Sequence, residues 1–459
     1  MEPVTLGFVA KSVAGRLDGD AEMPIVSVST DTRAVEPGCL FIALAGERYD
    51  GHDFVGEAFA KGAAAALVHK PVDVRGPTVM APDTSRALLA LASAYRGLFS
   101  LPVCGVTGSV GKTSTKEMVY AVLSRRYKTH KNEGNRNNAI GMPMSVFGLK
   151  HSHGAAVFEM GMSALGEISQ LSHVARPRIG IITNIGVSHI EMLGSREAIL
   201  RAKLEIADGM EPDGVLLLNG DDPLLLGASR TAPRKVVTFS IENTSCDYTA
   251  VRIEPEGAGL RFVIRSYDGV TPAKIPVIGT HNVYNALAAF AAGRLLGVSP
   301  WEAARGLCDF KTQGQRQLMT EWRGATLIED CYNASPDSMR AAFSVLAAVG
   351  SGGRRIAVLA DMLELGSHSA ETHLAVGKMA AESGVDLLFA YGDEARRVCE
   401  GFHAARPGTP EACQAFEDKQ ALAQRLEQTV VSGDTLLFKG SRGMRLEEVI
   451  ESLRATELK

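Results

Sequence analysis

Short apolar runs alternate with amphipathic segments along most of the chain. In its middle part, the runs at residues 103–106, 155–158, 179–183 and 215–218 have the length and composition of buried strands. Segments with helical spacing separate them, so that strand and helix alternate. This order predicts an α/β fold built around a parallel sheet.

A change of period follows this region. Residues 236–278 alternate apolar and polar positions in steps of two, which predicts antiparallel strands in an appendage of the central sheet. A helix is then expected over residues 283–296. After it, Ser299, Pro300 and Glu302 have the arrangement of a capping box with proline in the first helical position.

The same patterning divides the 459 residues into three parts. Residues 1–82 predict a small N-terminal α/β domain, with a helix at 53–61 that Asp53 would cap. Residues 83–312 predict a central domain with a parallel sheet like that of a P-loop ATPase. Residues 313–459 predict a Rossmann-like C-terminal α/β domain, because apolar strands and helices alternate again.

Composition narrows the class of protein. The net charge of −4 argues against nucleic-acid binding, which requires a basic surface. The seven cysteines contain no Cys-x-x-Cys pair, so reduced thiols are expected rather than disulfides or a zinc site. No apolar run has the roughly 18 residues of a membrane span, and no signal-peptide pattern is present. We therefore expect a cytoplasmic protein without a membrane span.

A glycine-rich loop follows the strand at 103–106 and precedes a helix that begins at Lys112. Such a loop cradles phosphates, because backbone N–H groups and the positive end of the helix point at the anion. Lys112 would reach the β and γ phosphates, and the Thr113 hydroxyl would bind Mg2+. The predicted nucleotide contacts are Thr107, Gly108, Ser109, Val110, Gly111, Lys112, Thr113 and Ser114.

The loop departs from the usual phosphate-loop pattern, since Val106 occupies the first glycine position. The alternative is a glycine-rich connection in which Lys112 and Thr113 stand together by chance. The flanking strand and helix favour the nucleotide site.

Polar residues gather at three further places in the central part of the chain. They are the segment 135–138, Glu159 at the end of a strand, and Asn184 at the end of the next strand. Ligands of open α/β sheets bind outside the carboxyl ends of the strands, so these residues predict one site beside the phosphate loop. A carboxylate such as Glu159 suits Mg2+, which combines few protein oxygens with substrate phosphates.

Other polar residues allow two interpretations each. Segments 29–33 and 46–52 suit either a binding lip or ordinary turns. The basic loop at 439–443 suits either a carboxylate or phosphate, or a solvated turn. His189 is either structural or part of the site, and Lys203 by its spacing alone is an exposed helix lysine.

Taken in order, these motifs resemble those of the ATP-dependent Mur ligases of peptidoglycan synthesis, over essentially the whole chain. The matching segments include 107–116, 134–138, 159–162, 183–186 and 279–282. In the last domain, Tyr-Asn-Ala-x-Pro-Asp-Ser at 332–338 and Asp-Met-Leu-Glu-Leu-Gly at 361–366 resemble one branch of the family. That branch adds D-alanyl-D-alanine to a UDP-N-acetylmuramoyl tripeptide.

The resemblance implies the reaction and its cofactors. ATP would phosphorylate the terminal carboxylate of the UDP-linked tripeptide, and the amine of D-alanyl-D-alanine would attack the acyl phosphate. Two Mg2+ ions and a carbamylated Lys203 are implied. The resemblance also implies small-molecule substrates. We expect a monomer, because no exposed apolar helix face stands out in the sequence. The alternatives are a Mur-type ligase that adds a single amino acid, a folylpolyglutamate synthetase, and a P-loop protein without catalysis.

The resemblance also implies roles for single residues. Catalysis would depend on Lys112, His189 and Lys203. ATP would contact the phosphate loop together with Asn137, Asn138, Asn282, Arg316 and Asp330. The metal ligands would be Thr113, Glu159, His189 and Lys203. The substrates would contact Thr30, Thr32, Arg33, Gly46, Asp50, Asn333, Ala334 and Asp337. This chain departs from the family pattern at Glu329, Ser335 and Gln315. The family usually has asparagine at the position of Ser335, so the resemblance carries no side-chain contact with the dipeptide over to this serine.

Overall fold

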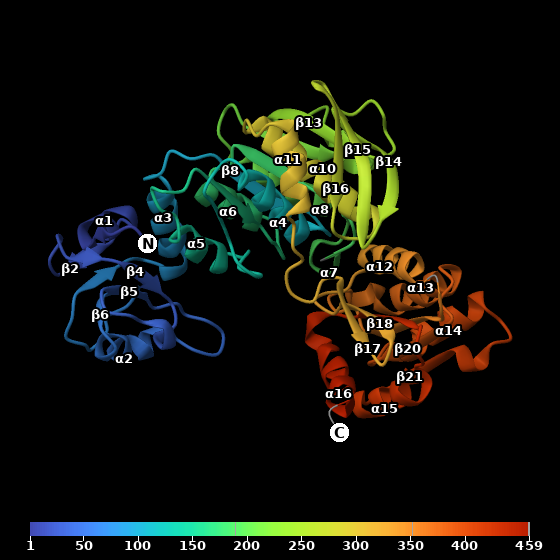
Figure 1. Ribbon diagram of the computed structural model, residues 1–459. Helices are drawn as coiled ribbons and strands as arrows, with labels where there is room; N and C mark the ends of the chain where they lie inside the picture. The colour runs from blue at the N-terminus through green and yellow to red at the C-terminus, as the bar shows by residue number, and fades with distance from the viewer. Residues whose placement is uncertain (189, 351, 458–459) are drawn as a thin grey trace.

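A computed structural model describes residues 1–188, 190–350 and 352–457. The chain forms three α/β units, each with its own sheet (Figure 1). The blue N-terminal unit and the orange-red C-terminal unit lie apart from each other, and the central unit connects them. Within the described parts of the chain, none of the helices combines the length and hydropathy that crossing a lipid bilayer requires.

The central sheet has nine strands, and its phosphate-loop strand β8 lies in the interior. In spatial order the strands are β16 (Gly269–Ile275), β15 (Gly259–Ser266), β14 (Tyr248–Glu256), β13 (Lys235–Ser240), β12 (Val215–Asn219), β11 (Ile179–Ile182), β8 (Val103–Thr107), β10 (Ala155–Glu159) and β9 (Thr129–Lys131). Strands β8, β10, β11 and β12 pair in parallel, as predicted, and β9 and β13 extend this parallel ladder at its two ends.

The predicted antiparallel appendage is only partly correct. Strands β14, β15 and β16 do pair in antiparallel fashion. However, β13 is parallel to β12, and β14 is parallel to β13. The segment 236–278 therefore extends the central sheet, because β13 and β14 continue its hydrogen-bonded ladder.

Strand β8 is buried on both faces, which explains its continuous apolar run. Cys104 and Val106 pack with the helices α4 (Lys112–Leu123), α10 (Thr280–Leu295) and α11 (Pro300–Cys308). Val103 lies in the core of the opposite face with α3 (Thr84–Arg96), α6 (Glu167–Ala175) and α8 (Arg196–Leu204). The capping box at the start of α11 is confirmed.

A buried arginine ties α3 to the central sheet. Arg96 donates hydrogen bonds to the carbonyl oxygens of Ala175 (3.0 Å), Phe99 (2.6 Å) and Leu101 (2.9 Å). Burial lowers its pKa to about 10. These bonds satisfy buried carbonyl oxygens at the end of α6 and in the loop between α3 and β8.

The N-terminal unit contains a five-stranded sheet and a separate pair of short strands. The sheet runs β2 (Arg16–Asp18), β7 (Thr78–Met80), β6 (Ala63–Val68), β5 (Cys39–Ile42) and β4 (Ser27–Ser29), and β1 (Val4–Thr5) pairs with β3 (Pro24–Ile25). The prediction that Asp53 caps a helix is wrong. Asp50 caps a 3-10 turn at Gly51–Phe54 by accepting from His52 N, and α2 (Val55–Ala60) continues from that turn.

The C-terminal unit has the predicted alternation of parallel strands and helices. Its sheet runs β17 (Leu318–Trp322), β18 (Ala325–Asp330), β22 (Thr435–Lys439), β19 (Arg355–Ala360), β20 (Leu387–Tyr391) and β21 (Cys413–Phe416), and β17 alone is antiparallel. Helices α12 (Pro336–Val349), α13 (Ser369–Glu382) and α14 (Ala395–Ala405) pack into one core, and α15 (Lys419–Thr429) and α16 (Glu447–Glu457) into another.

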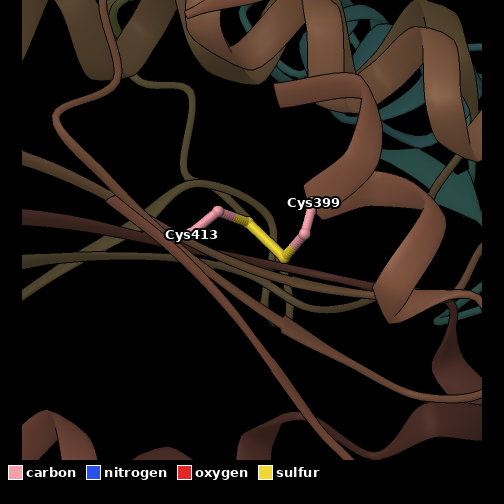
Figure 2. Close-up of a disulfide and its surroundings, with 2 residues drawn as sticks. All are labelled: Cys399 and Cys413. Atoms are coloured by element: carbon pink, nitrogen blue, oxygen red, sulfur yellow. A yellow bond between two sulfur atoms is a disulfide. The ribbon is translucent and has the colours of Figure 1, made fainter. Parts of the chain in front are cut away.

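Two cysteines of this unit form a disulfide, so the expectation of seven reduced thiols is wrong. Cys399 on α14 and Cys413 at the start of β21 are bonded, with Cα atoms 5.5 Å apart (Figure 2). The bond arises because α14 packs against β21. A separation of 14 residues gives no local motif that would announce it.

We predict that the disulfide stabilises the C-terminal unit. Replacing Cys399 and Cys413 together by alanine should lower the free energy of unfolding of this unit by about 3 kcal/mol, because closing a loop of about 15 residues restricts the unfolded chain. Trp322, buried in this unit, reports the transition by fluorescence in urea. The control is Cys308→Ala at a free, exposed thiol. Equal unfolding midpoints for wild type and double variant would contradict the prediction.

Candidate active site

A cavity of about 750 Å³ lies between the carboxyl end of the central sheet and the C-terminal unit. The phosphate loop and Glu159 line it from the central unit. Asp330, Tyr332 and Arg442 line it from the C-terminal unit. The cavity lies beside β8, where the chain continues to β9 and β10 on one side and to β11 on the other. This is the position at which open α/β sheets bind ligands.

The glycines of the phosphate loop are required by its geometry. Gly108 (φ 149°) and Gly111 (φ 86°) adopt backbone angles that disfavour other residues. A Cβ atom at Gly108 would lie 1.8 Å from Thr183 Oγ1, and one at Gly111 would lie 2.6 Å from Asn285 Oδ1. Helix α4 then begins at Lys112 without a side-chain cap. Its first N–H groups are thus suited to an anion.

The end of β11 holds this loop in place. Thr183 Oγ1 donates to Val110 O (2.6 Å), and Asn184 both donates to Val110 O (3.0 Å) and accepts from Val110 N (2.9 Å). Lys112 Nζ closes the loop from inside by donating to Gly108 O (2.8 Å). Burial lowers the pKa of Lys112, although Glu159 opposes this shift.

Glu159 is placed by two neighbours from separate elements. Its Oε2 accepts a hydrogen bond from Thr113 Oγ1 (2.7 Å), and its Oε1 accepts one from Asn137 Nδ2 (2.7 Å). The carboxylate and the hydroxyl put two hard oxygen donors side by side next to the phosphate loop. This donor set fits Mg2+, which completes its shell with phosphates and water.

Among the described residues, no group of three or more His, Cys, Asp or Glu side chains is placed to hold a metal ion. His189, predicted as a metal ligand, lies outside the described residues.

Lys203 on α8 is not the exposed lysine that its spacing suggests. Its side chain is 1% exposed, and it lines the cavity. Burial lowers its pKa well below the usual value, and the nearby Lys112 acts in the same direction. A lowered pKa favours the neutral amine, which is the nucleophilic form of this side chain.

Across the cavity, Tyr332 stacks two guanidinium groups. Arg316 lies 3.9 Å from its ring centroid, and Arg442 lies 5.1 Å from it. Nearby, Asp330 Oδ2 accepts from Lys439 Nζ (2.6 Å). The C-terminal unit thereby presents two arginines to the cavity, which suits a phosphate or a carboxylate.

A polar cluster lies at another end of the cavity. Asn282 Nδ2 donates to Ile278 O (2.8 Å) and to Gln317 Oε1 (3.0 Å), and the Gln317 amide lies 2.9 Å from His281 Nε2. Burial lowers the pKa of His281 to about 4, so the ring is neutral at physiological pH. Gln317 therefore connects the C-terminal unit to α10 of the central unit.

The structure gathers most, though not all, of the predicted site residues in this cavity. Besides the phosphate loop, the lining includes Asn137, Asn138, Glu159, Lys203, Asn282, Arg316, Asp330, Asn333 and Ala334. Asp337 is not among the lining residues, and a Cβ atom at Gly186 would lie 2.2 Å from its Oδ2. Ser335, in the lining, accepts from Ser338 N and so caps α12.

The residues predicted in the N-terminal unit do not reach the cavity. Those residues are Thr30, Thr32, Arg33, Gly46 and Asp50. The Arg33 side chain is 85% exposed and pairs with Asp31 (2.7 Å). Asp50 pairs with Lys70 (2.6 Å) and His52 (2.6 Å).

Several lining residues were not predicted from the sequence as parts of the site. They are His281, Gln317, Tyr332 and Glu364. Arg442 and Lys439 belong to the basic loop at 439–443, which already suited an anion. Gln317 carries no local signal, because only the approach of the two units brings it to Asn282.

Models of three domain families match the chain. The catalytic domain of the Mur ligase family matches residues 24–123, the Mur ligase middle domain 106–293, and the Mur ligase glutamate ligase domain 316–442.

Known proteins similar to the chain match it at nearly full length. The UDP-N-acetylmuramoyl-tripeptide–D-alanyl-D-alanine ligase of Bacillus subtilis is 41% identical and covers 98% of both chains. The ligase of the same name from Escherichia coli is 36% identical over 99% of both. Among solved structures, MurF from Acinetobacter baumannii superimposes with a TM-score of 0.93 at 32% identity, over 99% of both chains. MurF from Thermotoga maritima in complex with ADP has a TM-score of 0.83 at 28% identity, over 94% of this chain and 97% of that one. With these matches and the cavity beside its phosphate loop, the chain belongs to the Mur ligase family.

Proposed function

We propose that the chain is an ATP-dependent ligase that joins D-alanyl-D-alanine to UDP-N-acetylmuramoyl-tripeptide. The products are ADP, phosphate and UDP-N-acetylmuramoyl-pentapeptide for peptidoglycan synthesis. The full-length identity of 41% to a ligase of that name carries the proposal. A phosphate loop facing a cavity with two arginines opposite supports it.

The reaction requires positively charged groups that hold the phosphates in place, and it requires no protein nucleophile. An oxygen of the tripeptide carboxylate attacks the γ phosphorus of ATP, and ADP leaves. The amine of the dipeptide then attacks the carbonyl carbon of the acyl phosphate. Phosphate leaves with the carboxylate oxygen, and the amine loses a proton as the peptide bond forms. The site must therefore orient ATP, the tripeptide carboxylate and the dipeptide amine, and it must stabilise the transferring phosphoryl group.

The residues of the phosphate loop would bind the nucleotide. The N–H groups at the start of α4 and Lys112 face the cavity where the β and γ phosphates would lie, and Asn137 and Asn138 would contact the γ phosphate. Arg316, held against Tyr332, would approach the phosphates from the other unit. Asn282 would contact the adenine, and Asp330 the ribose.

Mg2+ fits the oxygen pair of Thr113 and Glu159. We propose a second ion held by His189 and Lys203. When bound, the ions neutralise the phosphate charge and polarise the oxygens of the transferring group. Glu159 would contribute by holding its carboxylate at a position that Thr113 and Asn137 define.

Carbamylation of Lys203 is the second part of this proposal. The lowered pKa favours the neutral amine, whose nitrogen can attack CO2 and lose a proton. The product is an anion, which is a hard oxygen ligand where the free amine is not.

The remaining assignments concern the substrate contacts, the domain boundaries, the oligomeric state and the cellular location. The N-terminal residues Thr30, Thr32, Arg33, Gly46 and Asp50 would bind the UDP part, and Asn333, Ala334 and Asp337 would face the dipeptide. We propose domain boundaries after residues 82 and 312, a monomeric state, and a place in the cytoplasm, where ATP and UDP-linked precursors occur together.

The function is tested by phosphate release from ATP with purified protein, Mg2+ and bicarbonate. Release should require both the UDP-linked tripeptide and D-alanyl-D-alanine, and a product heavier by the dipeptide should appear by mass spectrometry. Release with single amino acids or folate instead would assign another ligase of the superfamily. No release with any substrate would overturn the proposal.

We predict that Glu159→Gln lowers kcat by about a hundredfold or more, because it removes the charge that faces the phosphates and the ion. The amide keeps the size of the side chain, so the fold should remain intact. Steady-state phosphate release measures the effect. The control is Glu256→Gln at the end of β14, where the exposed carboxylate pairs with Lys274 of β16. A wild-type kcat in Glu159→Gln would contradict the assignment.

We predict that Lys203→Met abolishes ligation and yet stabilises the fold at neutral pH in bicarbonate-free buffer. The lysine pKa is lower in the folded chain than in the unfolded chain. Between the two values the unfolded chain binds more protons, so stability is lost as pH falls through that window. Methionine removes this loss. The melting temperature of the variant should therefore exceed that of wild type at neutral pH, and the difference should shrink as pH rises toward the ordinary lysine value. A variant that melts lower at neutral pH would contradict the prediction.

A further inference from the structure

Asn132 lies at the point where strand β9 leaves the central sheet. The last pair of the β9–β10 ladder joins Lys131 to Val157. Beyond it, the chain turns into the segment 133–138, while β10 continues to Glu159. The Asn132 side chain fills the missing place in the ladder. Its Oδ1 accepts from Glu159 N (2.9 Å), and its Nδ2 donates to Glu159 O (3.1 Å). A primary amide has the same donor and acceptor as a peptide group, so it can replace one.

The same amide also fixes the segment that carries Asn137. Asn132 Nδ2 donates a second hydrogen bond, to Arg136 O (2.7 Å). Next along the chain, Asn137 O accepts from Gly161 N (2.8 Å), and Asn137 Nδ2 donates to the Glu159 carboxylate. Asn132 therefore holds Glu159 through its backbone, and it holds the segment whose Asn137 positions the Glu159 carboxylate.

Helix α4 holds the backbone of Asn132. Lys116, which is fully buried, donates from Nζ to Asn132 O (2.8 Å) and pairs with Glu117 (3.0 Å). One turn earlier on the helix, Thr113 donates to the Glu159 carboxylate. The start of α4, Asn132 and the end of β10 thus form a closed ring of hydrogen bonds around the Glu159 backbone and carboxylate.

We propose that Asn132 is a positioning residue for the metal-binding carboxylate. It sets the distance between Glu159 and the phosphate loop through the Glu159 backbone, and it does not touch substrate or ion. This inference rests on the proposed function in one respect, namely that Glu159 binds the Mg2+ of a bound nucleotide. Asn132 is fully buried, and its three side-chain hydrogen bonds all go to the backbone of Glu159 and Arg136.

The test is ADP binding to the full chain, measured by titration calorimetry across a series of MgCl2 concentrations. In Asn132→Leu, which keeps the size and removes all three hydrogen bonds, the half-saturating Mg2+ concentration should rise by about tenfold or more. ADP binding in EDTA should stay unchanged, since the phosphate loop remains. The KM for the UDP-linked tripeptide should stay unchanged as well. The control is Asn243→Leu, at an exposed turn where the side chain accepts one bond from Ser245 N (3.1 Å).

A second variant keeps the proposal testable if the leucine disturbs folding. Asn132→Asp retains the shape and the acceptor toward Glu159 N, and it loses both donors. It should shift the Mg2+ dependence in the same direction. An unchanged Mg2+ dependence in a folded variant would overturn the inference, as would an equal loss of ADP affinity with Mg2+ and with EDTA.

The inference and the proposed function fail separately. Wild type that ligates the dipeptide, with variants of unchanged Mg2+ dependence, would refute the role of Asn132 alone. Wild type that binds ADP with Mg2+ and never ligates would refute the function. In that case a shifted Mg2+ dependence in the variants would still support the role of Asn132.

Discussion

The hydrogen bond between Thr113 and Glu159 joins the two elements on which the site depends. It links the start of α4, which carries the phosphate loop, to the end of β10, with 2.7 Å between the oxygens. Each element is also held by further hydrogen bonds. Thr183 and Asn184 hold the loop, and Asn132 holds the strand end. The carboxylate and the hydroxyl therefore have fixed positions before any ligand binds, which is the preorganisation that charge stabilisation requires.

The site carries a cost in stability. Burial disfavours charge on Lys203, and the nearby Lys112 acts in the same direction. A fold selected for stability alone would place an apolar side chain at Lys203. The retained lysine fits a position where a neutral amine is chemically useful.

Much of the fold could be predicted from the sequence, because its signals are local. The strand, the glycine loop and the helix from Lys112 lie next to one another in the chain, and so do Ser335 and the helix that it caps. The disulfide between Cys399 and Cys413 could not be predicted, since only the packing of α14 on β21 brings the two sulfurs together.

The site was predictable to the same extent. Glu159 and Asn137 follow strands or loops at one edge of the sheet, so their convergence follows from the fold class. Gln317 and Arg442 come from the other unit, and the orientation of that unit is a tertiary property. The burial of Lys203 was missed because a helix lysine is ordinarily exposed, although Ile199 and Ile206 lie on the same face of the helix.

In the proposed reaction, the site activates a carboxylate by transferring a phosphoryl group to it. The most direct measurement uses UDP-N-acetylmuramoyl-tripeptide with oxygen-18 in its terminal carboxylate, together with ATP and D-alanyl-D-alanine. If an acyl phosphate forms, the released phosphate must carry one labelled oxygen per peptide bond made. Phosphate without the label, formed while the peptide product accumulates, would contradict the account.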